Sequence, residues 1–175
     1  TSTAAIKLFE AHVMLGLLFN CESWIGITEA QIDELQSFQD NFLKKLLHLP
    51  VSTPKAILHW NCGKEMVKWR IAKSKLMFVR KMRQADCDNI CKRAILNEII
   101  IGTKGLASEC KDLADEIGLR DVRFCDVSKG EIRRAIKTHS KKMRRQEIMA
   151  STKVGDRVSE DPKDYTYMTY MTMNN

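Results

Sequence analysis

The chain has 175 residues and a formal net charge of +7, from 29 Lys and Arg against 22 Asp and Glu. Residues 64–83 and residues 129–145 each hold eight basic residues and one Glu, a local net of +7, so everything else sums to −7 (13 basic, 20 acidic). This distribution excludes a diffusely basic protein and is typical of one that binds a polyanion through two cationic helices.

The first helix is expected over residues 4–20. Its apolar residues include a series at helical spacing, Ile6, Phe9, Val13 and Leu17. Further apolar residues widen this face until the helix is apolar nearly all round, so it must be buried. Because the chain begins with Thr1, we expect it to be a piece of a longer protein that supplies some of the partners. The apolar run at residues 13–19 is shorter than the ~20 residues of a membrane span, so no membrane partner is expected.

Local signals predict the next helices. Thr28 and Gln31 form a capping-box pattern that opens a second helix, which Pro50 ends. Thr53 and Pro54 predict the N-cap and first position of a short helix. A long helix then follows Gly63 and runs to about residue 85.

The second half of the chain also reads as helical. We expect helices over residues 86–101 and 106–117, punctuated by Gly102 and Gly105 and stopped by Gly118. A second capping box, Ser128 to Glu131, opens a last helix that reaches about residue 150. Residues 165–173 alternate loosely with Thr, but they lie in a polar tail that we expect to be disordered. The prediction is an all-α chain: a helical bundle over 1–101, a connector with an amphipathic helix and a basic C-terminal helix over 102–150, and a disordered tail over 151–175.

The helix after Gly63 is predicted to have two distinct sides. Its apolar face gathers Val67, Ile71, Phe78 and Met82. The opposite face gathers four cations that could follow a phosphate backbone: Arg70, Lys73, Arg80 and Lys81. The alternative is an ordinary solvated face.

The last helix is more extreme in charge. Its apolar stripe is narrow, and the remaining surface carries Arg133, Arg134, Lys137, Lys141, Lys142, Arg144 and Arg145. Like charges three and four residues apart oppose helix formation, and a polyanion would relieve that repulsion. A nuclear import signal and an unused solvated helix are the alternatives.

No other cluster predicts chemistry. Cys87 and Cys91 are four residues apart, but a zinc site needs further ligands at a recognisable spacing, so buried thiols are the better interpretation. Six irregularly spaced cysteines without a secretory signal predict reduced thiols in the nucleus or cytoplasm. Packing rather than ligation or base stacking is expected for His12, His48, His59, Trp24, Trp60 and Trp69. Catalytic motifs are missing, and neither a metal nor a small-molecule ligand is expected.

Four motifs point to a family. Residues 17–24 (LLFNCESW) resemble the LLYG-x-E-x-W signature just past the palm in reverse transcriptases of non-LTR (LINE-type) retrotransposons. Residues 32–39 (IDELQSFQ) resemble the family's I-x-x-L-E-x-x-Q helix, and residues 42–50 (FLKKLLHLP) resemble its x-L-R-K-I-L-x-x-P segment. Residues 52–63 resemble the STP…E-x-G stretch of one animal branch. The motifs occur in the family's order and cover residues 17–83, with weaker similarity to residue 118. Phe19 and Cys21 stand where the family often has Tyr and Ser.

The resemblance implies that the chain is the thumb, and the region after it, of an RNA-directed DNA polymerase. Such a helical thumb clasps the template–primer duplex, and its contacts are non-specific because a polymerase slides along every sequence. The implied partners are an RNA–DNA or DNA duplex and the upstream palm. The catalytic Asp-Asp strand lies upstream in the family, so no activity is expected from this fragment alone, and magnesium is expected only in the palm. The candidate contacts are Arg70, Lys73, Arg80, Lys81, Arg133, Arg134, Lys137, Lys141 and Arg144.

Two other functions stay open at this point. The chain could be a degenerate or domesticated protein-interaction module that docks a partner through its apolar first helix. It could also be a stand-alone DNA-binding protein, although the last helix lacks the base-reading side chains of a recognition helix.

Overall fold

The computed structural model describes residues 2–119 and 127–150. Within these ranges every regular element is a helix, which confirms the predicted all-α class. The elements are α1 (Ser2–Leu8), the π-helical η1 (Phe9–Met14), α2 (Leu15–Leu17), the 3₁₀-helical η2 (Cys21–Ser23), α3 (Glu29–Leu46), α4 (Lys55–Cys62), α5 (Val67–Arg83), α6 (Ile90–Ile101), α7 (Leu106–Glu116) and α8 (Lys129–Ala150). The predicted tail over 151–175 and Cys125 lie outside the described residues. Among the described helices, none is both long and apolar enough to cross a bilayer.

Two of the predicted caps are present. At the start of α3, the Gln31 amide N–H donates to Thr28 Oγ1 (3.3 Å) while Gln31 Oε1 accepts from the Thr28 amide (2.9 Å). At the start of α8, the Glu131 amide donates to Ser128 Oγ (3.1 Å), and Glu131 Oε2 accepts from the Ser128 amide (2.7 Å). Both reciprocal pairs satisfy amides that the first helical turn leaves without partners.

The predicted Thr53 cap is wrong. The first residue of α4 is Lys55, one position later than expected, and the Leu58 amide donates to the Pro54 carbonyl. Thr53 is buried, and its hydroxyl has no hydrogen-bond partner among the described residues. The helix start is therefore set by the backbone restriction at Pro54 rather than by a side-chain cap.

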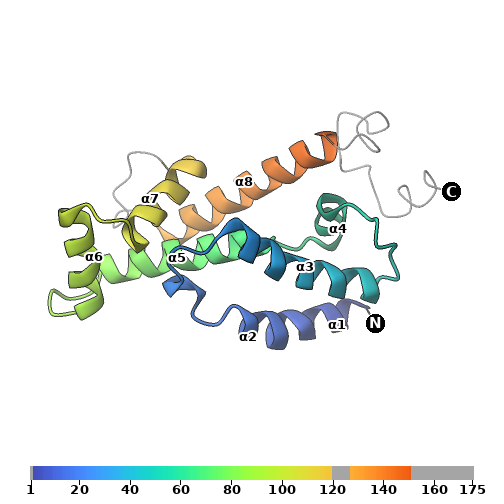
Figure 1. Cartoon of the computed structure of the whole chain (residues 1–175), viewed down its shortest axis with the longest axis horizontal. Coiled ribbons are helices and arrows are strands. Elements are labelled where there is room, and N and C mark those ends of the chain that lie inside the picture. The colour runs from blue at the N-terminus through green and yellow to red at the C-terminus, as the bar shows by residue number, and fades with distance from the viewer. Residues whose placement is uncertain (1, 120–126, 151–175) are drawn as a thin grey trace.

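Helix α5 runs through the middle of the molecule, with α8 along one side and α3 on the other (Figure 1). The expectation of an apolar face backed by a solvated one is wrong, because α5 is buried on most sides. Of the predicted apolar positions, Val67, Ile71 and Met82 are buried and Phe78 is half-buried. The helix also buries Trp69, Ala72, Lys75, Leu76 and Val79. Its buried apolar residues divide between two hydrophobic cores.

The two cores lie against different neighbours of α5. One joins Val67 and Ile71 to Phe9, Met14 and Cys21 of the N-terminal segment. The other joins α5 to α6, α7 and α8, and its buried members are Trp69, Ala72, Leu76, Val79, Met82, Ile95, Leu106, Cys110, Ala114, Ile117, Val127, Ile132 and Ile136. This second core has members on both sides of residue 101, where the predicted bundle ends and the predicted connector begins.

The first helix differs from its prediction in both regularity and burial. It is interrupted by η1, in which Phe9 (4 % exposed) and Met14 (0 %) are both buried although they are five residues apart. Five residues correspond to one π-helical hydrogen-bonded turn, so the wider turn brings these two side chains onto one face. Val13, which a period of 3.6 would place with Phe9, is 42 % exposed.

One side of this segment is open to solvent. Leu8, Leu15 and Phe19 are exposed, so the described residues do not by themselves provide the burial expected for this helix. The π-helical turn accounts for part of the difference, because it rotates the residues that follow it relative to a regular α-helix.

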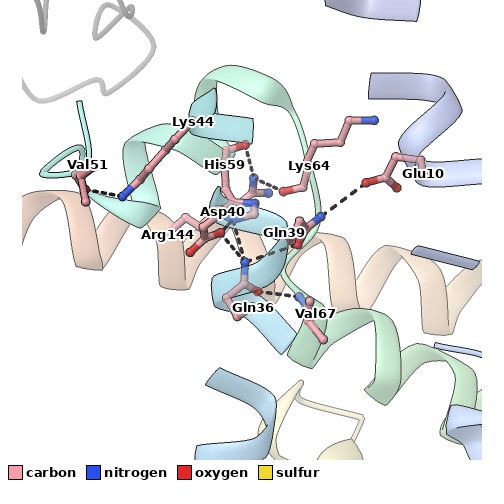
Figure 2. A network of polar contacts seen from close by, with 10 residues as sticks. All are labelled: Glu10, Gln36, Gln39, Asp40, Lys44, Val51, His59, Lys64, Val67 and Arg144. Carbon is pink, nitrogen blue, oxygen red and sulfur yellow. Dashed lines mark hydrogen bonds and ion pairs between the residues drawn. The ribbon is translucent and has the colours of Figure 1, made fainter. Parts of the chain in front are cut away.

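A buried polar network joins α3, α4 and α5 (Figure 2). Asp40 Oδ1 accepts from Gln36 Nε2 (2.7 Å) and lies 2.6 Å from His59 Nε2. Because the carboxylate oxygen is an acceptor, His59 Nε2 is the donor in this contact. Gln36 Oε1 in turn accepts from the Val67 amide (2.8 Å), the first amide of α5. The side chains of Gln36, Asp40 and His59 are at most 3 % exposed, so water does not compete for their hydrogen bonds. The network therefore holds the three helices in one relative placement.

A part-buried ion pair joins distant parts of the chain. Lys75 of α5 is 2 % exposed, and its Nζ lies 2.6 Å from Glu109 Oε2 of α7. The other carboxylate oxygen, Oε1, accepts from the Gly26 amide (2.6 Å). One carboxylate therefore connects the loop before α3, the central helix and α7.

Replacement of His59 by Ala is expected to lower the free energy of unfolding by about 3–5 kcal/mol, because it removes a buried partner of Asp40 and leaves that carboxylate with Gln36 as its remaining partner among the described residues. Urea denaturation followed by circular dichroism measures the change. His12→Ala, which removes an exposed imidazole, is the control and is expected to stay within about 0.5 kcal/mol of the wild type. A loss at His59 no larger than the loss at His12 contradicts the structural role of the network.

Candidate nucleic-acid interface

Helix α8 presents a buried stripe in which every fourth residue faces the protein. The stripe consists of Ile132 (0 % exposed), Ile136, Ser140, Arg144 and Ile148. Such a spacing keeps side chains on one slowly rotating face of a helix, which here packs on α5 and α4. The stripe fixes which cations of α8 reach the surface.

Arg144 lies on the buried side, although the sequence grouped it with the surface cations. Its side chain donates from the η1 nitrogen to the carbonyls of His59 (3.2 Å) and Lys64 (3.3 Å), as Figure 2 shows. Burial lowers the pKa of this guanidinium, and the nearby carboxylates of Glu65 and Glu147 oppose that change. Since an arginine stays charged in proteins, Arg144 is a charged donor that connects α8 to α4 and to the loop after it.

The other predicted contacts of α8 lie at the surface. Arg133, Lys137 and Lys141 are exposed, and none of them has an ion-pair or hydrogen-bond partner among the described residues. Arg134 is also exposed, and its Nε donates to the Gly130 carbonyl at 3.4 Å within the same helix. Three of these residues, Arg133, Lys137 and Lys141, follow one another at four-residue intervals and so form a row along the helix.

This row borders an open groove between α8 and the start of α5. The groove has a volume of about 670 Å³ and is lined by Gly63, Glu65, Lys73, Arg133, Lys137, Ser140, Lys141 and Arg144. Five of these residues are cationic and one is acidic, a local net charge of +4. A concave site with this charge attracts anions more strongly than the same charges would on a flat surface.

The predicted contacts of α5 are engaged to different degrees. The Arg70 guanidinium lies 2.7 Å from Glu10 Oε2, and Lys73 pairs with Glu65. Arg80 Nε donates to the Val127 carbonyl at 2.5 Å. Lys81 is exposed. Of the four, the structure brings only Lys73 to the groove that the α8 row borders.

Two groove residues were missed by reasoning from the sequence. Ser140 belongs to the four-residue series of α8, and that series could have been found by extending the spacing of Ile132 and Ile136. Glu65 stands alone among cations in the sequence, and nothing in its spacing indicates that it pairs with Lys73, eight residues away.

The remaining candidate residues are the cysteines, histidines and tryptophans. No group of three or more His, Cys, Asp or Glu within the described residues could hold a metal ion. Cys87 and Cys91 are exposed, so the expectation of buried thiols is wrong for both, while Cys21 and Cys110 are buried. His59 and Trp69 are buried as predicted, and the Trp69 ring meets the His139 imidazole edge-on with a centroid distance of 4.8 Å.

Comparison with known proteins adds no assignment. No family model, curated protein or solved structure matches this chain. The site is therefore interpreted from its own residues.

Arg144→Ala is expected to lower the free energy of unfolding by about 2–4 kcal/mol, because two carbonyls lose a charged donor in a buried place. Lys141→Ala, which removes an exposed cation three residues earlier, is expected to change it by less than about 0.5 kcal/mol. Thermal and urea unfolding of the two variants measure the difference. Equal effects would show that Arg144 does not hold the end of α4.

Alkylation by iodoacetamide at about pH 8 is expected to modify Cys87 and Cys91 in the native protein and to spare Cys110. Desolvation raises the pKa of Cys110 to about 12, so only about one thiol in 10⁴ is ionised at that pH. Mass spectrometry of tryptic peptides measures the extent at each position. Labelling in denaturant is the control, in which Cys110 reacts as well, and native labelling of Cys110 at the rate of Cys87 contradicts its burial.

Proposed function

We propose that this chain is the thumb and post-thumb region of a non-LTR retrotransposon reverse transcriptase, and that it holds the backbone of the template–primer duplex. The observation that carries the proposal is the row of Arg133, Lys137 and Lys141, three exposed cations on one side of α8 that have no partner among residues 2–119 and 127–150. The fragment contributes binding rather than chemistry, and magnesium would belong to the palm.

The geometry of the row suits a phosphate backbone. Residues 133 to 141 span about 12 Å along a helix axis, which corresponds to three or four nucleotides of one strand at ~3.4 Å each. Lysine and arginine heads on flexible stems contact phosphates without reading bases, so the contact does not depend on sequence. That property matches a protein that translocates along its substrate.

A backbone detail supports the family resemblance. Asn20 stands at the glycine position of the LLYG-x-E-x-W signature, and its φ is 55°. This left-handed conformation is the one that glycine adopts without strain and that asparagine tolerates better than most residues. Within the same turn the Asn20 side chain donates to Ser23 Oγ (2.8 Å), which donates back to the Asn20 carbonyl (2.9 Å). An asparagine in this left-handed turn is thus compatible with the glycine of that signature.

A protein-docking function is the second candidate, and the open apolar side of the first helix favours it. Leu15 is 69 % exposed and Phe19 is 79 % exposed, which is costly for large apolar side chains in water. An upstream palm or an unrelated partner would each cover this side. Duplex binding with a strong salt dependence separates the polymerase proposal from a docking function alone.

The affinity for a duplex is expected to fall steeply as salt is raised, because each neutralised phosphate releases counterions. Replacing Arg133, Lys137 and Lys141 together by Ala is expected to reduce the slope of log K against log salt by about 2.7 on B-form DNA, or about 0.9 for each contact. Fluorescence anisotropy with DNA and RNA–DNA duplexes measures the slope.

A matched control removes the same charge elsewhere. Lys45, Lys104 and Lys111 are exposed and do not line the groove. Their joint replacement by Ala is expected to leave the slope within about 1 of the wild type, since only general charge is lost. A flat salt response in the wild type, or equal slopes in the two triple variants, contradicts the proposal.

A further inference from the structure

The floor of the groove contains a polar group without a partner. Ser140 is 1 % exposed, and its Oγ has no hydrogen bond within the described residues. A serine inside a helix ordinarily bonds to the carbonyl four residues earlier or points to solvent, and Ser140 does neither. A buried hydroxyl without a partner is destabilising, so its presence at the lining of a cationic groove points to a ligand that would accept a hydrogen bond from it.

The groove also holds an internal carboxylate. Glu65 precedes α5 and pairs with Lys73, and both residues line the groove together with Ser140. Lys73 and Glu65 retain 35 % and 27 % side-chain exposure, so their pair is open to exchange with solvent ions. The carboxylate therefore occupies a position where an external anion would meet Lys73.

We propose that this groove is a seat for one phosphate group, bound by Ser140, Lys73 and Lys137, and that Glu65 holds Lys73 in place until the phosphate displaces it. The inference rests on the proposed function in one respect, since on that proposal the phosphate belongs to the backbone of the bound duplex. The seat would bind a single phosphate, while the row along α8 would contact the adjacent phosphates of the same strand.

The lining supplies the kinds of donor that a phosphate group accepts. A phosphodiester offers two charged oxygens that accept from a hydroxyl and an ammonium at the same time, and the lining supplies both kinds of donor. Arg144 adds positive charge from the inner end of the groove, although its η1 nitrogen is committed to backbone carbonyls. Displacement of Glu65 exchanges one ion pair for another, so the seat discriminates against weak anions.

Two substitutions test the seat directly in the full chain. Ser140→Ala is expected to fold like the wild type, because the hydroxyl makes no internal bond, and to weaken phosphate binding about fivefold. Glu65→Gln frees Lys73 and removes a repelling charge, so it is expected to tighten binding about two- to fivefold. Glu34→Gln is the matched control, because it removes an exposed carboxylate on α3 that does not line the groove.

The first measurement uses inorganic phosphate at constant ionic strength. Amide resonances of Gly63, Ser140 and Lys141 are expected to shift in a saturable way in the wild type, more weakly in Ser140→Ala, and at lower phosphate in Glu65→Gln. Glu34→Gln is expected to match the wild type. Equal shifts in all four proteins would indicate an adventitious ion only and overturn the seat.

The second measurement uses a DNA duplex and separates the seat from the function. If the duplex binds with a steep salt slope but neither Ser140→Ala nor Glu65→Gln differs from Glu34→Gln, the seat is overturned and the proposed function stands. If no duplex binds while inorganic phosphate still depends on Ser140 and Glu65, the seat stands and the proposed function is overturned. Parallel changes in both measurements support the two together.

Discussion

The buried contact between Asp40 and His59 is the constraint on which the remaining arrangement depends. Two buried polar side chains cost free energy unless each meets a partner. The contact therefore restricts the relative placement of α3, which carries Asp40, and α4, which carries His59. Gln36 extends this restriction to the first amide of α5. Arg144 extends it to α8 by binding the backbone carbonyl of the same histidine. A specific polar centre thus sets the geometry that the two hydrophobic cores then stabilise.

The orientation of α8 follows from that centre. Because Arg144 is held at the end of α4, the residues four positions apart before it turn inward, and the cations between them turn outward. These contacts fix the rotation of α8 about its own axis, so Arg133, Lys137 and Lys141 stay at the surface. A rigid presentation lowers the ordering cost of binding, since only the side chains lose freedom when a backbone phosphate is met.

Local features of the fold could be predicted from the sequence, while features set by tertiary contacts could not. The capping boxes at Thr28 and Ser128 were predictable because both partners lie within four residues. The burial of Lys75 and Arg144 was not, because composition counts each as a surface cation, and only the distant partners make burial favourable. The π-helical turn in η1 was also missed, since a search at a period of 3.6 assumes a regular helix. For the interface, charge density identified α8, but the groove and its unpaired hydroxyl depend on contacts between α8 and α5.

Glu109 has a consequence for how the chain acquires its structure during synthesis. Its carboxylate bonds to Gly26, 83 residues earlier, and to Lys75, 34 residues earlier. Until residue 109 has left the ribosome, the lysine at the centre of α5 has no counterion and is better solvated than buried. The contacts that Gly26 and Lys75 make with Glu109 therefore form only after α7 has been synthesised. Contacts between residues so far apart in the sequence must close a long loop before they form, which slows the folding of this part of the chain.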